Sequence, residues 1–351
     1  MVRSVFKYAL KLVSAVVAVF TLLSYVAPHV NPVVFPWFSF FGTAFPWLLF
    51  ANLALLAIWA SRLNRFALYH LGLILVGWQY MTGFIGFNGG RDVVPEKSIS
   101  VVTHNLGALF RGKKMTDALR EKTADAYVAF LEKNGAPDIL CTQETSGKFY
   151  RLVAEKMGYE HTFNLKKGTV ILSKYPMEGG GDIPFGKTAN STLWVDVRID
   201  GRTVRVYNVH LQSNKVTNDT EKVIEEGELE KETWHEIGSV LGKVGSATKL
   251  RTEQAQRLHQ HITECTHPVI VCGDFNDTPN SYVYHHISEG LTDAFEVGGW
   301  GRGTTFAGRL PLLRIDYILT DPGFPVYSSR VVRDSRWSDH YPVWAVLETG
   351  K

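Results

Sequence analysis

Apolar positions follow two different patterns along the chain, and the change occurs near residue 90. Before it, residues 12–61 and 66–90 form two long stretches in which histidine is the only side chain that can carry a charge near neutral pH. Proline and asparagine interrupt the first stretch at 28–36. Because a helix needs about 20 apolar residues to cross a bilayer, the pattern predicts three membrane-spanning helices, near 8–27, 37–60 and 67–87.

Residues 1–90 are therefore interpreted as a membrane anchor. Pro46 lies within the second helix, where a proline either kinks a helix or marks its start. The alternative is a cleaved signal peptide followed by buried core helices. A signal peptide has one apolar segment of roughly 7–15 residues, whereas this chain has three longer ones, so the anchor is favoured.

The basic residues of the anchor predict its orientation. Arg3, Lys7 and Lys11 precede the first helix, and Arg62 and Arg65 lie between the second and the third. Lys and Arg are enriched in cytoplasmic loops, so the N-terminus and the 61–66 loop are expected in the cytoplasm. Three crossings then place the remainder of the chain on the outer side of the membrane, which is the periplasm in a Gram-negative bacterium.

From residue 91 onward, short apolar runs rich in β-branched residues alternate with helical patterns. Residues 87–90, Phe-Asn-Gly-Gly, are typical of a short flexible joint before this region. Apolar residues at helical spacing predict helices near 116–133 and near 248–264. The runs predict strands at 99–103, 139–142, 170–172, 193–199, 203–210, 269–272, 315–319 and 343–347.

Strand pairing and helices together indicate an α/β fold for residues 91–351. Asp200 and Gly201 separate two of the strands, and an Asp-Gly pair in this position is a strong hairpin signal. Hairpins mixed with helices favour two sheets packed face to face with helices outside them. Residues 213–247 are polar with an acidic excess and are interpreted as a surface insertion with helical content.

The charge balance differs between the two parts of the chain. The first 90 residues contain five of the 37 Lys and Arg residues and none of the 34 Asp and Glu residues. The net charge of +3 therefore hides a slightly acidic C-terminal part. Sequence-independent DNA binding depends on a basic surface, so this balance argues weakly against a nuclease.

Carboxylate, amide and imidazole side chains lie where the apolar strands end. Strand ends on one edge of a sheet converge, and ligand crevices form there. Any one of these residues alone is more often a cap, a turn or a core residue, but so many in one part of the chain indicate a site. The candidates are Asn105, Glu144, Asn208, His210, Asp274, Asn276, Asp316, Asp339 and His340.

These residue types suit phosphoester hydrolysis. Oxygen ligands without a Cys–His cluster favour Mg²⁺ or Mn²⁺ over a structural zinc. A carboxylate can activate water while an amide binds a phosphate oxygen, and an imidazolium with a metal ion can neutralise growing charge. No G-x-S-x-G elbow occurs, so the sequence gives no sign of a serine nucleophile.

The ordered motifs HNLG, TQET, VHLQS, GDFNDTP, RIDYIL and SDHYPV resemble the endonuclease/exonuclease/phosphatase superfamily. The resemblance covers essentially everything after the anchor. It implies a four-layer αββα sandwich and hydrolysis of a phosphoester with one or two divalent metal ions. Two departures leave the substrate open: no additional phosphate-contacting Tyr or Arg is evident, and the 213–247 insertion is long for a minimal nuclease.

The resemblance also implies a role for each motif residue. Asn105, Glu144 and Asp339 match metal-binding positions, and His210 matches the first catalytic histidine. Asp274 matches the residue that orients or deprotonates water. Asn276 and His340 match positions that contact the substrate phosphate, and Asp316 matches the partner of His340. Asn208 is expected to contact the phosphate as well, because it lies two residues before His210 and so faces the same side of the strand. The catalytic set is thus predicted as His210, Asp274, Asn276, Asp316 and His340.

The expected activity is that of a membrane-anchored, metal-dependent phosphoesterase. Its substrate is a lipid head group, an inositol phosphate or a nucleic acid. A membrane tether and the lack of net positive charge favour lipid or small phosphoesters slightly over DNA. The expected partners are that substrate and the bilayer, with no obligate protein partner evident. The alternative is a catalytically silent membrane protein that uses the fold as a binding module.

Overall fold

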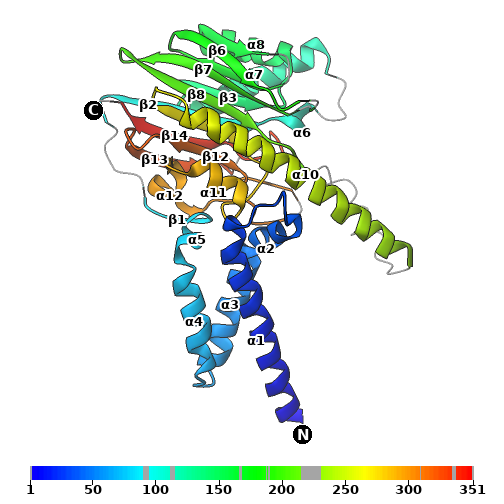
Figure 1. Ribbon diagram of the computed structural model, residues 1–351. Helices are drawn as coiled ribbons and strands as arrows, with labels where there is room; N and C mark the ends of the chain where they lie inside the picture. The colour runs from blue at the N-terminus through cyan, green and yellow to red at the C-terminus, as the bar shows by residue number, and fades with distance from the viewer. Residues whose placement is uncertain are drawn as a thin grey trace.

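A bundle of apolar helices leads into a domain built on two large sheets (Figure 1). The computed structural model describes residues 2–89, 95–110, 115–165, 168–186, 188, 190–214, 231–308, 310–333 and 337–349. Residues 215–230, which make up much of the predicted polar insertion, lie outside this description. The strands predicted from the apolar runs are all present, most of them one to three residues longer than expected.

The first sheet contains six strands. They are β2 (Ser98–Asn105), β3 (Ile139–Gln143), β4 (His161–Asn164), β5 (Val170–Ser173), β13 (Val326–Val331) and β14 (Val343–Glu348). Their spatial order is β13-β14-β2-β3-β5-β4. The β2–β3 pair is parallel, and the other neighbours are antiparallel.

The second sheet repeats this plan. Its strands are β6 (Met177–Ile183), β7 (Ser191–Ile199), β8 (Arg202–His210), β9 (Val269–Asp274), β10 (Thr292–Asp293) and β12 (Asp316–Thr320), in the spatial order β10-β12-β9-β8-β7-β6. Only the β8–β9 pair among these strands is parallel. Each sheet therefore has one central parallel pair whose carboxyl ends point to the same edge.

Three apolar clusters hold the sheets and helices together. One fills the space between the sheets with small and β-branched residues such as Val101, Val195 and Ile270. The others lie on the outer faces of the sheets, one beneath α7 (Asp117–Lys133) and α8 (Gly147–Met157), the other beneath α10 (Lys231–Thr263) and α11 (Tyr282–Ser288). The predicted α/β sandwich is thus the observed fold. Two short helices, α6 (Gly107–Phe110) and α12 (Ala294–Gly298), complete the domain.

Local sequence explains where several elements begin. Thr116, Ser146 and Ser281 cap α7, α8 and α11 by accepting a backbone N–H bond three residues later. Asp200 and Gly201 have φ angles of 48° and 80° between β7 and β8. A tight hairpin turn requires positive φ at both positions, and glycine adopts it without steric cost.

One helix differs from its prediction. The helix expected near 248–264 is α10, which begins at Lys231 and contains 33 residues. Its first half coincides with the end of the predicted insertion and projects beyond the sheets, to one side of the N-terminal bundle (Figure 1). Apolar residues recur there at helical spacing, for example Trp234, Ile237, Leu241 and Val244, in keeping with the helical content expected of the insertion.

The N-terminal bundle contains α1 (Val2–Val26), η1 (Ala27–His29), η2 (Pro36–Phe38), α2 (Ser39–Thr43), α3 (Phe45–Ala60), α4 (Phe66–Val76) and α5 (Trp78–Thr82). The first predicted helix matches α1. The second is bent by 48° between α2 and α3, with Pro46 in the first turn of α3. The third prediction, 67–87, is wrong in its extent, because the helix breaks at Gly77 and residues 85–87 form a strand.

Within the part of the chain that the structure describes, one helix, Val5–His29, is long and apolar enough to cross a membrane, or two if the bent pair Pro36–Ala60 is one span. The α4 helix contains 11 residues and rises only about 16 Å, roughly half of a bilayer core. Much of α1 is apolar and exposed, for example Leu12, Val16 and Phe20.

Buried polar side chains join the helices of the bundle. Asn52 on α3 donates to Thr21 Oγ1 on α1 at 2.8 Å and lies 2.9 Å from His70 Nδ1 on α4. Trp59 donates to Ser14 Oγ at 2.9 Å. Polar contacts of this kind link helices where the surroundings are apolar.

The predicted flexible joint at 87–90 is instead fastened to the domain where the structure describes it. Strand β1 (Ile85–Phe87) pairs with β11 (Trp300–Arg302). Asn88 adds two hydrogen bonds, one to Gly299 O at 3.0 Å and one to Glu296 O at 2.9 Å. The Gly-rich sequence suggested a flexible joint, but the backbone groups of this segment have partners about 200 residues further along the sequence.

Further contacts between the bundle and the domain include two that involve buried side chains. Asn280 donates from Nδ2 to Ser24 O of α1 at 3.0 Å. The fully buried Arg314 donates to Gly83 O at 2.9 Å. It also donates to both carboxylate oxygens of Asp293. We refer to β1–β11 pairing and these two contacts together as the docking contacts.

Candidate active site

The predicted site residues gather at one edge of the sandwich, where the parallel strands end. Asn105 ends β2, His210 ends β8 and Asp274 ends β9. His210 is the register partner of Asp274, which is also opposite Asp316 at the start of β12. Because parallel strands bring their carboxyl ends to one edge, residues distant in sequence meet there.

Asn105 joins the two sheets at this edge. Its amide nitrogen donates to Glu144 Oε1 at 3.3 Å and to Asp274 Oδ2 at 3.0 Å, and its amide oxygen accepts from Gly107 N at 2.9 Å. A Cβ at Gly107 would lie 2.1 Å from Glu144 Oε2. The glycine of the HNLG motif therefore leaves the space that the Glu144 carboxylate occupies.

Two site residues have strained backbones. Glu144 has a φ angle of 53° and Asn276 one of 54°. Positive φ is uncommon outside glycine and costs of order 1–3 kcal/mol unless the surroundings compensate. At Asn276 the backbone N–H donates to Asp274 Oδ1 at 2.8 Å and the side chain donates to Leu211 O at 3.0 Å. Strain of this kind is found at functional sites, where it sets the direction of a side chain.

Asp316 and His340 form a buried pair. His340 Nδ1 lies 3.0 Å from Asp316 Oδ2 and 3.2 Å from Oδ1, so its N–H donates to the carboxylate. On the other side of the ring, His340 Nε2 is 3.8 Å from Asp274 Oδ2. One oxygen or nitrogen from each of Asp274, Asp316 and His340 lies within 4.8 Å of the others, and all three residues are buried.

The acidic neighbours keep His340 charged. Burial by itself lowers the pKa of His340, but Asp316, Asp274 and Asp339 outweigh burial and raise it to about 10. The imidazolium therefore persists at neutral pH, with Nδ1 bound to Asp316.

Asp274 is the carboxylate whose proton affinity is most altered. Burial raises the pKa of Asp274 to about 7, with Asp316 adding to the increase and His340 opposing it. A carboxylate with a pKa near neutrality is suited to accepting a proton from water.

His210 lies across the site from His340. Its Nε2 is 3.7 Å from Glu144 Oε1. Burial lowers the pKa of His210, while Glu144 opposes that decrease and His340 adds to it. The two histidines thus differ: His340 is cationic at neutral pH, and His210 is neutral.

Asn208 does not have the position that was predicted. It is fully buried between the sheets. Its amide nitrogen donates to Thr142 O at 3.0 Å and Val170 O at 2.7 Å, and its oxygen accepts from Gln143 Nε2 at 2.7 Å. With both amide hydrogens used inside the protein, Asn208 cannot donate to a phosphate. Asn208 lies two residues before His210 on the same strand, which suggested a shared role. Asn208 instead faces the other sheet and not the open edge.

Replacing Asn208 with Ala is therefore expected to destabilise the fold. The change leaves three buried groups unpaired: Thr142 O, Val170 O and Gln143 Nε2. Each unpaired group costs about 1–3 kcal/mol. We expect the thermal midpoint to fall by about 6 °C or more, with KM of the remaining folded protein unchanged. Thr203→Ala, on the same strand at its exposed end, is the matched control. An unchanged midpoint with a raised KM would restore the phosphate-binding role.

Asp339 lies beside His340 in the chain and is half-buried. Its carboxylate accepts from Ser338 Oγ at 3.1 Å and contributes to the raised pKa of His340. Its role as a metal ligand stays a prediction.

Two positioning residues were not singled out from the sequence. His104 bridges Tyr127 and His340: its ring nitrogens lie 3.0 Å from Tyr127 Oη and 3.2 Å from His340 O. Thr305 Oγ1 accepts from the backbone N–H groups of Ile315 and Asp316, at 2.9 and 3.1 Å. His104 is in the HNLG motif and could have been suspected, whereas Thr305 lies outside every motif.

The donor groups at this edge suit a hard divalent cation. Glu144 and Asp274 bring carboxylate oxygens to this edge from both sheets, and the Asn105 amide lies between them with its nitrogen directed at both carboxylates. Oxygen donors of this kind bind Mg²⁺ or Mn²⁺. The side chain of Glu144 is 39% exposed, so this group is accessible from the open edge.

The sandwich fold, with its site at this edge, is that of a family whose members are hydrolases that act on phosphoesters. The chain belongs to the Endonuclease/Exonuclease/phosphatase family, whose model matches residues 102–340. Enzymes of this family depend on divalent metal ions. A second model, a domain of unknown function, matches residues 7–84 in the N-terminal bundle. No curated protein matches the chain in a sequence comparison.

Solved structures share the fold at low sequence identity. D. rerio TDP2 complexed with single strand DNA product is 16% identical, with a TM-score of 0.52, over 72% of this chain and 99% of that one. The mannosyl-6-phosphatase Bt3783 from Bacteroides thetaiotaomicron VPI-5482 is 16% identical, with a TM-score of 0.50, over 71% and 99%. An endonuclease/exonuclease/phosphatase from Beutenbergia cavernae DSM 12333 is 23% identical, with a TM-score of 0.50, over 72% of each chain. These likenesses concern the fold alone.

Proposed function

We propose that the chain is a membrane-anchored phosphoesterase that uses a divalent metal ion, Mg²⁺ or Mn²⁺, and attacks phosphorus with an activated water. The observation that carries the proposal is the buried triad of Asp274, Asp316 and His340 beside the Asn105–Glu144 pair. One carboxylate with a pKa near neutrality and one charged imidazole lie 3.8 Å apart. A general base, Asp274, and a positively charged imidazole, His340, are thus available at the same place.

Asn105, Glu144 and Asp339 are the residues that would hold the metal ion, which would supply positive charge for the phosphate oxygens. Asp274 accepts a proton of the attacking water, whose oxygen bonds to phosphorus as the ester P–O bond breaks, and the leaving alkoxide takes up a proton from bulk water. His340, kept charged by Asp316, donates from Nε2 to a phosphate oxygen, because Nδ1 is already bound. Neutral His210 and the amide of Asn276 border the same edge and orient the phosphate.

The N-terminal bundle supports membrane anchoring. The basic residues that predict its orientation lie at one end of the bundle: Arg62 is 5.3 Å from the Phe6 ring, and Lys11 is 5.4 Å from the Phe66 ring. In Figure 1, the N-terminus and the turn between α3 and α4 are at this end, and the domain is at the other. This arrangement favours a cytoplasmic N-terminus and a catalytic domain on the outer side.

This topology predicts the behaviour of the domain in intact cells. A periplasmic-type reporter fused after Lys351 is expected to be active, and protease added to spheroplasts is expected to degrade the domain. Moving the basic residues, with Lys7→Gln and Lys11→Gln combined with two lysines introduced in the 30–35 loop, should reduce this outer-side signal. Reporter activity confined to the cytoplasm, with the domain protected from protease, would contradict the orientation.

The substrate we favour is a lipid phosphoester. Anchoring holds the enzyme where lipid head groups are concentrated, and residues 91–351 are slightly acidic, which disfavours DNA. Inositol phosphates and nucleic acids use the same phosphoester chemistry and are the alternatives.

A substrate panel on the full-length chain in detergent tests the proposal. We expect hydrolysis of bis-p-nitrophenyl phosphate with Mg²⁺ or Mn²⁺, none with EDTA, and faster turnover of a phospholipid such as sphingomyelin in mixed micelles than of plasmid DNA or inositol phosphates. Asp274→Ala is the inactive control. No turnover of any substrate with either metal would favour the silent binding module, and fast cleavage of DNA alone would overturn the lipid preference.

A further inference from the structure

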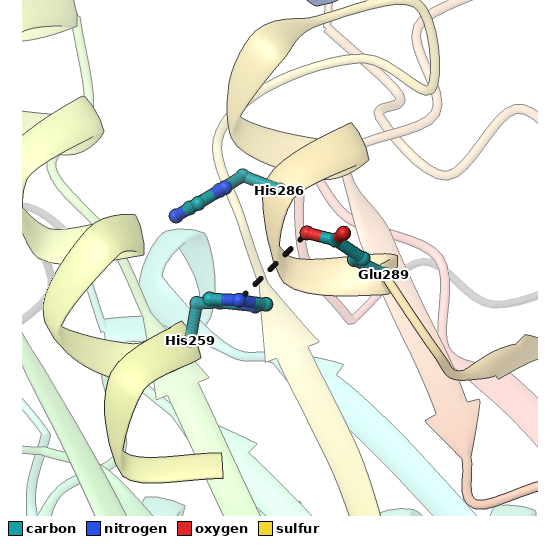
Figure 2. Close-up of side chains that lie close together, drawn as sticks. All are labelled: His259, His286 and Glu289. Atoms are coloured by element: carbon teal, nitrogen blue, oxygen red, sulfur yellow. Dashed lines mark ion pairs between the residues drawn. The ribbon is translucent and has the colours of Figure 1, made fainter. Parts of the chain in front are cut away.

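A second cluster of metal-binding side chains lies on the outer face of the domain, away from the strand ends. It contains His259 of α10 together with His286 and Glu289 at the end of α11 (Figure 2). Neither helix contributes a side chain to the site described above. The sequence motifs of the active site include none of the three residues.

The three side chains come close enough to share one ion. One ligand atom from each lies within 4.8 Å of the others. His259 Nε2 is 3.8 Å from Glu289 Oε2, and the centroids of the two imidazole rings are 4.3 Å apart. Donors bound at about 2.0–2.1 Å to a four-coordinate ion are roughly 3.4 Å from one another, so only small rotations would be needed.

The cluster has features that hydrogen bonding within the protein does not explain. His259 Nδ1 is buried and has no hydrogen-bond partner in the described part of the chain, and His259 Nε2, at 3.8 Å from Glu289 Oε2, is too far from that oxygen for a hydrogen bond. Two imidazoles face each other, an arrangement that is unfavourable when both are protonated. The neutral imidazole is the form that binds metals.

Two imidazoles and a carboxylate are the ligand set of a three-residue zinc site, with water in the fourth position. Mg²⁺ and Ca²⁺ prefer oxygen ligands, so this set favours borderline transition metals. The active-site edge, with its amide and carboxylate oxygens, has the opposite preference. The chain therefore presents two chemically distinct ligand sets.

We propose that His259, His286 and Glu289 form a transition-metal site, for zinc or a similar ion, that fastens α11 to α10. Both helices are adjacent to the loop that follows Asp274. On α10, Arg251 binds Asp277 of that loop at 3.1 Å and Gln212 O at 2.8 Å. Tyr282 of α11 stacks on His286. That loop leads from β9 into α11, so an ion at this site would hold α11 against the helix that binds the loop.

Cobalt(II) provides a direct test on the full-length chain in detergent, with excess Mg²⁺ present to occupy the oxygen-rich site. We expect a saturable visible absorption of the intensity typical of four-coordinate Co²⁺, displaced by one equivalent of Zn²⁺. Zn²⁺ should also raise the thermal midpoint. His286→Ala and His259→Ala should weaken binding by more than about 10–100-fold, the loss known for residues that only support a ligand.

His285→Ala is the matched control, because His285 is on the same helix but contacts His29 instead. It should bind Co²⁺ as the wild type does. Glu289→Gln guards against misfolding, because this side chain is 70% exposed, and it should also weaken binding. The proposal is overturned if the wild type gives no saturable signal in excess Mg²⁺, or if His286→Ala, His259→Ala and Glu289→Gln all bind as tightly as His285→Ala. Phosphoesterase activity is not needed for either outcome.

Discussion

Replacing Glu144 with Gln is expected to lower kcat/KM by about 10³-fold while the protein remains folded. The carboxylate faces Asn105 and His210 at the open edge of the site, and a full negative charge there is what a divalent cation requires. Loss of that charge removes several kcal/mol of transition-state stabilisation, and each 1.4 kcal/mol corresponds to about tenfold. Gln has the same shape, so the strained φ angle at this position is unaffected.

The measurement is a Mg²⁺ titration of turnover with circular dichroism of the same samples. Glu155→Gln, an exposed carboxylate on α8, is the matched control and should behave as the wild type. If Glu144→Gln reaches wild-type turnover at saturating Mg²⁺, then Glu144 is not a metal ligand. If the thermal midpoint of Glu144→Gln falls so far that unfolding accounts for the lost activity, Glu144 has a structural role instead.

Asp316→Asn and His340→Gln are each expected to cost on the order of 10²-fold or more in turnover. The pair is bonded at 3.0 Å and fully enclosed, so removal of either member disables the other. The double variant should be little worse than the worse single one, because residues that act as a unit are strongly non-additive. A double-mutant cycle on kcat/KM measures this directly. Losses that multiply fully would mean that the two residues act independently.

The same pair sets the alkaline limit of activity. His340 has a pKa of about 10 against an ordinary value of 6.5, so its cationic form, and the activity, should be lost as pH rises through about 10. Asp316→Asn removes the largest cause that raises this pKa, and the alkaline limb should move toward neutrality. The raised pKa also stabilises the fold, fully below pH 6.5 and progressively less as pH approaches 10.

The sequence predicted those features whose signal is local. Strand positions followed from apolar runs, and the Asp200-Gly201 turn followed from its residue types. The proximity of Asp316 and His340 was implied by the family resemblance and is present in the structure. Helix α8 and strands such as β4 and β6 were not predicted, because β6 contains three glycines and β4 is polar at its edge.

Features that depend on distant partners could not be predicted. Asn208 has the same residue type and spacing as a phosphate ligand, and only the second sheet shows that its amide is used in the core. The joint at 87–90 has the composition of a flexible linker, but Trp300–Arg302 supply a strand partner. Thr305 carries no charge and fits no motif, yet it fixes the backbone at Asp316.

The docking contacts have a consequence for how the enzyme searches for substrate. A domain on a flexible linker explores a hemisphere whose radius grows with the square root of the linker length. Here strand pairing, Asn280 and Arg314 fasten the domain directly to the helices. In the proposed membrane setting, the catalytic edge would then travel in the plane of the bilayer at one height and one tilt. Encounter would become a two-dimensional process, and the molecules within reach would be those whose phosphate lies at that height.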